Sequence, residues 1–268
     1  MSRRSILAAT LAVTAALALS ACSTSATPAS SAAAGGEDLG LVKAGTLTVA
    51  TEGTYRPFSY HDESGKLVGF DVEIAEAVAK KLGLKVSFQE TQWDAIFAGL
   101  DAGRFDLIAN QVSINAEREA KYLFSEPYTV SPGVIIVKDT DDSISSFDDL
   151  KGKTTAQSLT SNWYELAQDH GAKVEAVEGW AQAVSLLEQG RVDATINDKL
   201  TYLDYVNTKG STGLKIAAET DDPAKSAFAL TKKKTALVDA IDDALTELRA
   251  DGTLTTISKK YFGTDVTQ

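Results

Sequence analysis

The chain has 268 residues, of which 44% are hydrophobic and 24% are charged, a balance that is ordinary for a globular protein. Its formal net charge of −11 argues against nucleic acid and against an anionic membrane surface as partners. A small ligand that carries its own charges remains possible.

The beginning of the chain has the features of a secretory signal. Arg3 and Arg4 precede an Ala-rich apolar stretch at 6–19, which is too short for a stable membrane span. The sequence Leu19-Ser20-Ala21-Cys22 that follows resembles the lipobox of bacterial lipoproteins, in which the signal is cut before the cysteine and the cysteine is lipidated. We therefore expect residues 1–22 to be a lipoprotein signal peptide with its lipobox.

Cys22 is the only cysteine, so no internal disulfide can form. We expect it to carry a lipid anchor, and the alternative is a chance thiol after a small-residue cleavage site. Residues 23–38 are mostly Ser, Ala, Thr and Gly, and we expect a flexible tether there because this composition cannot build a core. About 230 residues remain, enough for one large domain or two lobes.

Strands and helices alternate along the first third of the folded part. An apolar run such as Leu107-Ile108-Ala109 fits a buried parallel strand, and the apolar residues of 71–82 recur at helical spacing. The expected elements are strands at 47–51, 86–88 and 107–109 and helices at 71–82 and 93–102. This alternation predicts an α/β fold with a parallel sheet.

Part of this pattern occurs twice, at a constant offset of 87 residues. Trp93, Gly103, Arg104, Asp106 and Asn110 recur as Trp180, Gly190, Arg191, Asp193 and Asn197. The repeat predicts two lobes built on one plan, with Asn110 and Asn197 at the ends of equivalent strands, facing each other across a cleft. For the tryptophans the alternative is core packing, and for the aspartates it is a turn or cap role.

A possible anion site follows the first of these strands. Asn110, Gln111 and Ser113 come where the strand should end, and Asn115 has N-cap chemistry, which would place Arg118 in the first turn of a helix. Ligands of open α/β sheets bind beyond the carboxyl ends of the strands, where an arginine and a helix N-terminus suit a carboxylate. The alternative is a solvated helix face.

The chain crosses between the expected lobes twice. Residues 127–133 form an extended segment before the apolar strand 134–137, and the chain returns near 223–228. We expect helices at 237–250 and 254–261 to pack on the first lobe. Two crossings make a hinge, which allows a cleft to close on a ligand.

Several motifs together resemble the bacterial extracellular solute-binding proteins of family 3, the polar amino-acid receptors of ABC importers. They are Gly69-Phe70-Asp71-Val72-Glu73-Ile74, Ser113 with Arg118 before Phe124-Ser125-Glu126-Pro127-Tyr128, and Asn197-Asp198 after Gly190-Arg191-Val192-Asp193. The resemblance implies a two-lobed, periplasmic-binding-protein-like fold of type II, with a mainly parallel sheet flanked by helices in each lobe and a two-strand hinge. Lobe 1 would comprise residues 39–131 and 228–268, and lobe 2 residues 132–227.

The resemblance also implies roles for individual residues. Tyr55 and Trp93 match the aromatic pair that sandwiches the ligand, Arg118 the arginine that binds its carboxylate, and Ser113 a hydroxyl that serves both charged groups.

Three further positions carry over in the same way. The backbone carbonyl of Gln111 and the carboxylate of Asp198 match the acceptors of the ligand ammonium, and the backbone N–H of Ser161 matches a donor to its carboxylate. Leu159 and Ser161 stand where many members of the family have glycine.

A finer likeness points to the L-cystine-binding branch. It lies in the segments 109–112, 156–162 and 195–200, which supply neutral amides able to hold a second zwitterionic head. Glu52 could instead serve a cationic side chain. The complete expected ligand-binding set is Glu52, Tyr55, Phe58, Trp93, Asn110, Gln111, Ser113, Arg118, Gln157, Thr160, Ser161, Asn162, Asn197 and Asp198.

These observations predict a lipid-anchored, extracytoplasmic monomer that delivers L-cystine to an ABC permease and, through it, to the ATPase, with no cofactor, metal or catalytic residue. One alternative is another amino-acid ligand, such as glutamine, arginine or histidine. A second is an enzyme similar to cyclohexadienyl dehydratase on the same fold, although the only histidines, His61 and His170, lie outside the expected cleft segments. A third is a sensor or adhesin lipoprotein with a vestigial cleft.

Overall fold

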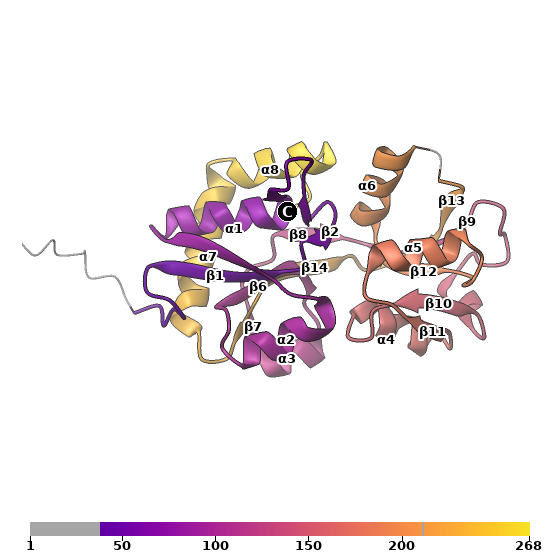
Figure 1. The fold of residues 1–268 in the computed structure, drawn as a ribbon, viewed down its shortest axis with the longest axis horizontal. Coiled ribbons are helices and arrows are strands. Elements are labelled where there is room, and N and C mark those ends of the chain that lie inside the picture. Colours follow the sequence, from indigo (N-terminus) through magenta and orange to yellow (C-terminus); the bar gives the residue numbers. More distant parts are fainter. Residues whose placement is uncertain (1–37, 211) are drawn as a thin grey trace, which may run out of the picture. The chain divides into compact units, whose positions relative to one another are not determined.

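The structure is a computed structural model that describes residues 38–210 and 212–268 (Figure 1). The expected signal peptide, Cys22 and all but the last residue of the expected tether lie outside the described residues. In the described part of the chain no helix is long and apolar enough to cross a membrane.

The first lobe is built on a sheet with the strand order β5-β1-β6-β14-β7, and β8 pairs with β14. Strand β1 is parallel to β5 and β6, whereas β14 is antiparallel to β6, β7 and β8. The strands are β1 (Thr46–Thr51), β5 (Lys85–Glu90), β6 (Leu107–Ser113), β7 (Tyr122–Phe124), β8 (Thr129–Ser131) and β14 (Ala224–Thr231).

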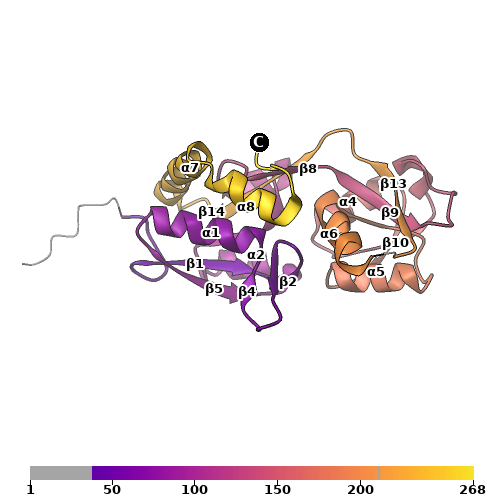
Figure 2. The ribbon, with the colours of Figure 1, turned by 90° about the horizontal axis from the view of Figure 1, so that it is seen from above.

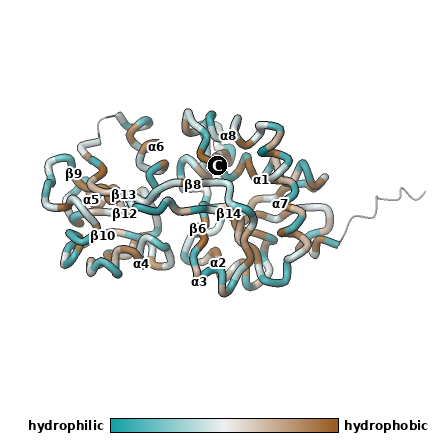
Figure 3. Tube along the Cα trace, turned by 180° about the vertical axis from the view of Figure 1, so that it is seen from behind, coloured by the Kyte–Doolittle hydropathy of each residue, from teal (hydrophilic) through white to brown (hydrophobic). Residues whose placement is uncertain are grey.

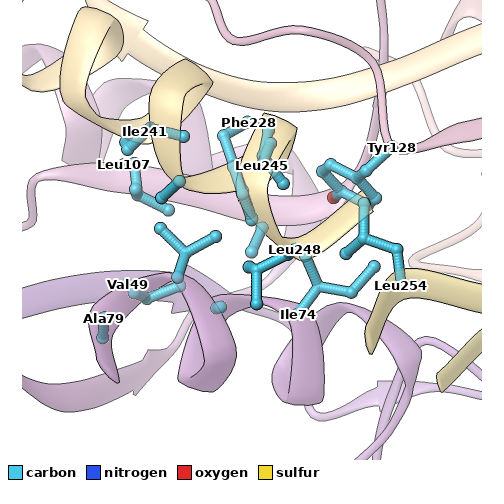
Figure 4. Close-up of a cluster of buried hydrophobic side chains, with 14 of the residues drawn as sticks. Val49, Ile74, Ala79, Leu107, Tyr128, Phe228, Ile241, Leu245, Leu248 and Leu254 are labelled. Carbon is cyan, nitrogen blue, oxygen red and sulfur yellow. The ribbon is translucent and has the colours of Figure 1, made fainter. Parts of the chain in front are cut away.

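Helices cover both faces of this sheet because side chains alternate along its strands. Val49 and Leu107 pack into a core formed with α1, α7 and α8, whereas Ala50 and Ile108 pack with α2 on the opposite face. Figure 4 shows Val49 and Leu107 meeting Ile74 of α1 and the leucines of α7. The helices are α1 (Phe70–Lys81), α2 (Trp93–Asp101), α3 (Ala116–Lys121), α7 (Thr235–Ala250) and α8 (Thr253–Phe262).

The second lobe follows a related plan. Strand β9 is antiparallel to both β12 and β13, β10 is parallel to β11, and the pair Thr155–Ala194 joins β10 to the start of β12 in the parallel direction. The strands are β9 (Gly133–Lys138), β10 (Thr154–Gln157), β11 (Lys173–Ala176), β12 (Thr195–Asp198) and β13 (Leu214–Glu219). The helices are a 3-10 turn (Phe147–Leu150), α4 (Asn162–Asp169), α5 (Trp180–Glu188) and α6 (Lys199–Lys209).

The expected elements of the first third are confirmed to within a few residues, and so are the two terminal helices. Their amphipathic character is visible in Figure 3 as teal and brown alternating along α1 and α7. The stretch after β1 was expected to be a loop, but it contains a small sheet of β2 (Thr54–Tyr55), β3 (Ser59–His61) and β4 (Leu67–Val68).

The α/β, two-lobed class is confirmed, but the sheets are mixed rather than mainly parallel. The reason is the hinge: β14 returns the chain antiparallel to β8, and β13 runs antiparallel to β9. Figure 2 shows these two connections between the lobes. They stay paired on both sides of the crossing, through Ser131–Ala224 in one lobe and a bond from Thr220 N–H to the Gly133 carbonyl in the other.

The repeat has a structural counterpart at its two aspartates. Asp106 accepts a hydrogen bond from Thr48 N–H at 2.8 Å and its own N–H donates to the Thr48 carbonyl at 2.8 Å. Asp193 makes the same exchange with Thr154, at 2.7 and 2.8 Å. Each aspartate therefore ties the start of β6 or β12 to the neighbouring strand of its sheet, β1 or β10, which is a long-range structural role rather than the expected turn or cap role.

Candidate functional site

The expected end of the strand at Asn110 is a bulge instead. In the ladder between β6 and β14, Ala229 pairs with Ile108 and Ala227 pairs with Val112. Between these two pairs the chain advances by four residues along β6 but by only two along β14. Asn110 and Gln111 are in this irregular stretch, and the strand then continues to Ser113. Bulges re-aim side chains next to binding sites, and this one releases Asn110 and Gln111 from regular pairing.

Asn110 is fixed by the end of β1. Its Oδ1 accepts from Glu52 N–H at 2.9 Å and from Thr51 Oγ1 at 3.1 Å, and its Nδ2 donates to Glu52 Oε2 at 2.6 Å. Burial raises the pKa of Glu52 to about 7, although the bond from Asn110 acts in the opposite direction. Asn110 therefore orients the Glu52 carboxyl, which titrates near neutral pH.

A cavity of about 330 Å³ lies beside these residues, within the size range of small-molecule sites. Among the described residues, its wall includes seven Asn or Gln residues and two glutamates but no Lys or Arg. It brings together nine of the expected site residues: Glu52, Tyr55, Trp93, Asn110, Gln111, Gln157, Ser161, Asn162 and Asn197. Asn110 and Asn197 are therefore both in the cavity wall, as the repeat predicted.

Aromatic side chains form part of the wall. The Tyr55 hydroxyl donates to Asn197 Oδ1 at 2.8 Å and accepts from Thr201 Oγ1 at 3.1 Å, which holds the ring against lobe 2. Trp93 is buried at the start of α2 and packs edge-on against Phe97. Tyr55 and Trp93 therefore give the cavity wall two aromatic rings that contacts with neighbouring residues hold in place.

Phe58 requires a correction. Its side chain is 0% exposed and lies in the lobe 1 core, between Tyr55, Phe70 and Phe262. The small β2-β3 sheet turns this residue inward, so it supports the Tyr55 ring from behind rather than lining the cavity.

Arg118 is buried, so the solvated-face alternative is wrong for this residue. Asn115 caps α3 by accepting from Arg118 N–H at 2.8 Å, as expected. The guanidinium donates to the carbonyls of Ser113 at 3.0 Å and Thr160 at 3.2 Å, and burial lowers its pKa to about 10. The neighbouring Glu117 and Lys121 are exposed and pair with each other.

Arg118, Ser113 and Thr160 lie next to one another but outside the cavity wall. Thr160 also donates through Oγ1 to Asp94 at 3.0 Å, and Ser161 caps α4 by accepting from Tyr164 N–H. The Ser161 N–H donates to the Ser158 carbonyl at 3.1 Å, so this expected ligand donor is engaged in a turn. Ser161 therefore both closes this turn and begins α4.

Asp198 is likewise outside the cavity wall, beside Asn197. Its Oδ1 accepts from Ser131 Oγ at 2.7 Å and from Leu200 N–H at 2.8 Å, which makes it the N-cap of α6. Burial raises its pKa to about 6. The carboxylate therefore joins the hinge strand β8 to lobe 2, next to the cavity.

The sequence did not reveal one side of the cavity. The additional polar and aromatic wall residues include Gln92, Trp163, Glu178, Trp180 and Gln182. The repeat could have found Trp180, because its partner Trp93 was expected in the site. Gln92 and Glu178 are linked by a 2.9 Å bond at the edge of the wall.

The chain belongs to the bacterial extracellular solute-binding proteins of family 3, whose family model matches residues 47–264. It is thus an extracytoplasmic solute-binding protein of the amino-acid ABC-importer class.

The chain is 54% identical to the L-cystine-binding protein TcyA of Bacillus subtilis over 229 residues, which is 85% of each chain. The L-cystine solute receptor of Neisseria gonorrhoeae, solved in an unliganded open conformation, is 46% identical, with a TM-score of 0.60 over 87% of this chain and all of that one. An ancestral arginine-binding protein, solved with arginine, is 40% identical, with a TM-score of 0.77 over 82% and 99% of the two chains.

Proposed function

We propose that this protein binds L-cystine between its lobes and delivers it to an ABC permease. The 54% identity with an L-cystine-binding protein over most of both chains carries the proposal. The chemistry of the cavity supports it. L-cystine has two zwitterionic heads and no net charge, and amides such as Asn162 and Asn197 can donate to a carboxylate or accept from an ammonium.

The competing ligand is a cationic amino acid such as arginine. Glu52 and Glu178 in the wall would suit a guanidinium, and an arginine-binding relative is 40% identical. The raised pKa of Glu52 weakens this alternative, because a carboxyl with a pKa of about 7 is partly neutral at pH 7.

A binding panel separates these ligands. In calorimetry and thermal shift at pH 7, L-cystine is expected to bind more tightly than arginine, glutamine, histidine and glutamate. Tighter binding of one of those four would overturn the cystine assignment and leave the importer role intact. Failure of every amino acid to bind would support the vestigial-cleft alternative.

Mass spectrometry of the bound compound tests the enzymatic alternative. Both histidines lie outside the cavity wall: His61 lies near Glu90 and His170 near Asp148. We infer that the site binds without catalysis, so mass spectrometry should recover the bound amino acid unchanged. The enzymatic alternative is a cyclohexadienyl dehydratase, which acts on compounds such as prephenate and arogenate. Conversion of either compound would contradict this inference.

We also propose that the protein is a monomer anchored through a lipid on Cys22, with lobe 1 at 39–131 and 228–268 and lobe 2 at 132–227.

Cys22→Ser is expected to release the protein from the membrane without changing its melting temperature, because residues 23–36 contain too few apolar side chains for a core. A single acyl chain binds only reversibly, so several chains on the cysteine are expected. Fractionation with membranes despite the substitution would contradict the anchor.

A further inference from the structure

Gln111 has an unusual backbone. Its φ of 50° makes it the one residue other than glycine with a positive φ among residues 38–210 and 212–268. A Cβ atom disfavours this left-handed conformation, and glutamine has no special tolerance for it. Such outliers persist only where the surroundings hold them, and they gather at ligand sites.

The buried carboxylate of Asp71 holds this conformation. Asp71 Oδ2 accepts from Gln111 N–H at 2.7 Å, and Asp71 Oδ1 accepts from Gln111 Nε2 at 2.6 Å. The two bonds grip one residue through its backbone and its side chain at once. Asp71 is 0% exposed in the first turn of α1, where the positive end of the helix dipole favours a negative charge.

The clamp also determines where the side chain of Gln111 lies. Its Nε2 donates to Thr129 Oγ1 at 3.1 Å as well as to Asp71, and Thr129 begins the hinge strand β8. The amide of Gln111 is thus directed into lobe 1. The backbone of Gln111, which lies in the bulge beside Asn110, is therefore the part of this residue that faces the cavity.

We propose that Asp71 is a positioning residue for ligand binding, which acts by holding the Asn110–Gln111 bulge in the shape that the cavity requires. The inference rests on the proposed binding function and adds a determinant of affinity that does not itself line the cavity. Without the clamp, the bulge relaxes to a right-handed or extended backbone, and the ligand must restore the left-handed form when it binds.

Two substitutions at Gln111 test whether the backbone conformation matters. Gln111→Ala and Gln111→Gly both remove the Nε2 bonds, but only alanine has a Cβ that opposes a positive φ. Gln111→Ala is expected to bind L-cystine about 5- to 30-fold more weakly than Gln111→Gly. Equal affinities of the two variants would overturn the proposal.

Substitutions at Asp71 test the clamp itself. Asp71→Asn replaces two acceptor oxygens of a carboxylate by one neutral amide oxygen, and its Nδ2 is accommodated only if the Gln111 amide turns over, so the clamp weakens and we expect about tenfold weaker binding or more. Adding Gln111→Gly to Asp71→Asn should recover part of this loss, because glycine adopts the left-handed form without a clamp.

Asp106→Asn is the matched control. Asp106 is also 0% exposed and bonded to a backbone N–H, but it precedes β6, at the end opposite the bulge, and pairs with Lys234. The Asp106→Asn substitution should lower the melting temperature and leave the L-cystine affinity unchanged. If Asp71→Asn changes only the melting temperature, as this control does, Asp71 is merely structural and the proposal fails. If the parent protein itself binds no amino acid, the proposed function fails instead.

Discussion

Arg118→Lys is expected to weaken amino-acid binding by about 30-fold to several thousand-fold while the ligand-free protein remains folded. Truncating one partner of a buried, hydrogen-bonded charge pair costs about 2–5 kcal/mol, and we expect the loss of two parallel guanidinium bonds to fall within the corresponding range of affinity. The effect depends on geometry, because lysine keeps the charge but lacks the planar fork that binds a carboxylate through two parallel bonds.

The structure leaves part of the Arg118 guanidinium for the carboxylate that we expect it to bind. Its Nη1 and Nη2 each donate to a carbonyl, of Ser113 and Thr160, and the guanidinium lies near the rings of Trp93 and Phe97. These contacts use two of its five N–H donors and fix its plane. The remaining donors have no anionic partner within salt-bridge distance among the described residues.

Calorimetry with L-cystine measures the loss, and thermal denaturation without ligand measures the fold. Lys121→Ala is the matched control, because Lys121 lies on the same helix but is exposed and pairs with Glu117. It should leave both quantities unchanged. An Arg118→Lys protein with parental affinity would show that the guanidinium only holds the two carbonyls together.

Local patterns determine what the sequence could predict. The helix at Phe70–Lys81 was found because its apolar residues recur at helical spacing and Gly83 follows, and the cap at Asn115 because its side chain suits that position. Both depend on residues within a few positions of each other. The repeat was found for the same reason, since it preserves residue types at a fixed offset.

The bulge in β6 could not be found in this way. It exists because β14, more than a hundred residues later, pairs with β6 on both sides of Asn110 and Gln111. Glutamine gives no signal for a positive φ, and the clamp on it comes from Asp71, which was noted only as part of a family motif. Long-range pairing overrode the local indication that the strand ends at Asn110.

The cavity wall likewise contains residues that the sequence could predict and residues that it could not. Tyr55 and Trp93 were expected from the family resemblance, whereas Phe58, also in the expected ligand-binding set, is turned into the core by the small β2-β3 sheet. Whether an aromatic residue in a short loop faces a ligand or a core depends on one alternation of side chains, which the sequence alone does not determine. Trp163 and Glu178 were missed because their position depends on how α4 and α5 border the cavity.

Asp198→Asn is expected to weaken L-cystine binding by at least about tenfold at pH 7, or roughly 1.4 kcal/mol, without harming the fold. The resemblance assigns this carboxylate to the ligand ammonium, and a charge-assisted bond is stronger than a bond to a neutral amide. Asparagine keeps an oxygen for Ser131 and Leu200 and is as good an N-cap as aspartate, so α6 should be retained.

The unliganded variant should be at least as stable as the parent at pH 7. Burial raises the pKa of Asp198 from its usual 3.8 to about 6, so the folded protein binds this proton more tightly than the unfolded chain does. The contribution of such a group to stability falls as pH rises from about 4 to 6 and stays low above that range. Asparagine does not titrate and avoids this loss.

The dependence of affinity on pH has the opposite sign, and it provides the most specific test. A ligand ammonium favours ionised Asp198, so the parent should bind L-cystine more weakly as pH falls from 7 to 5, where the carboxyl of the free protein becomes protonated. The Asn variant should lack this part of the decline. Glu52 and Asp71 have pKa values of about 7 and titrate in the same window, so Glu52→Gln serves as the control, and only the difference between parent and variant is assigned to Asp198. Parallel affinity curves for the parent and Asp198→Asn between pH 5 and 7 would show that this carboxylate caps α6 and does not bind the ligand.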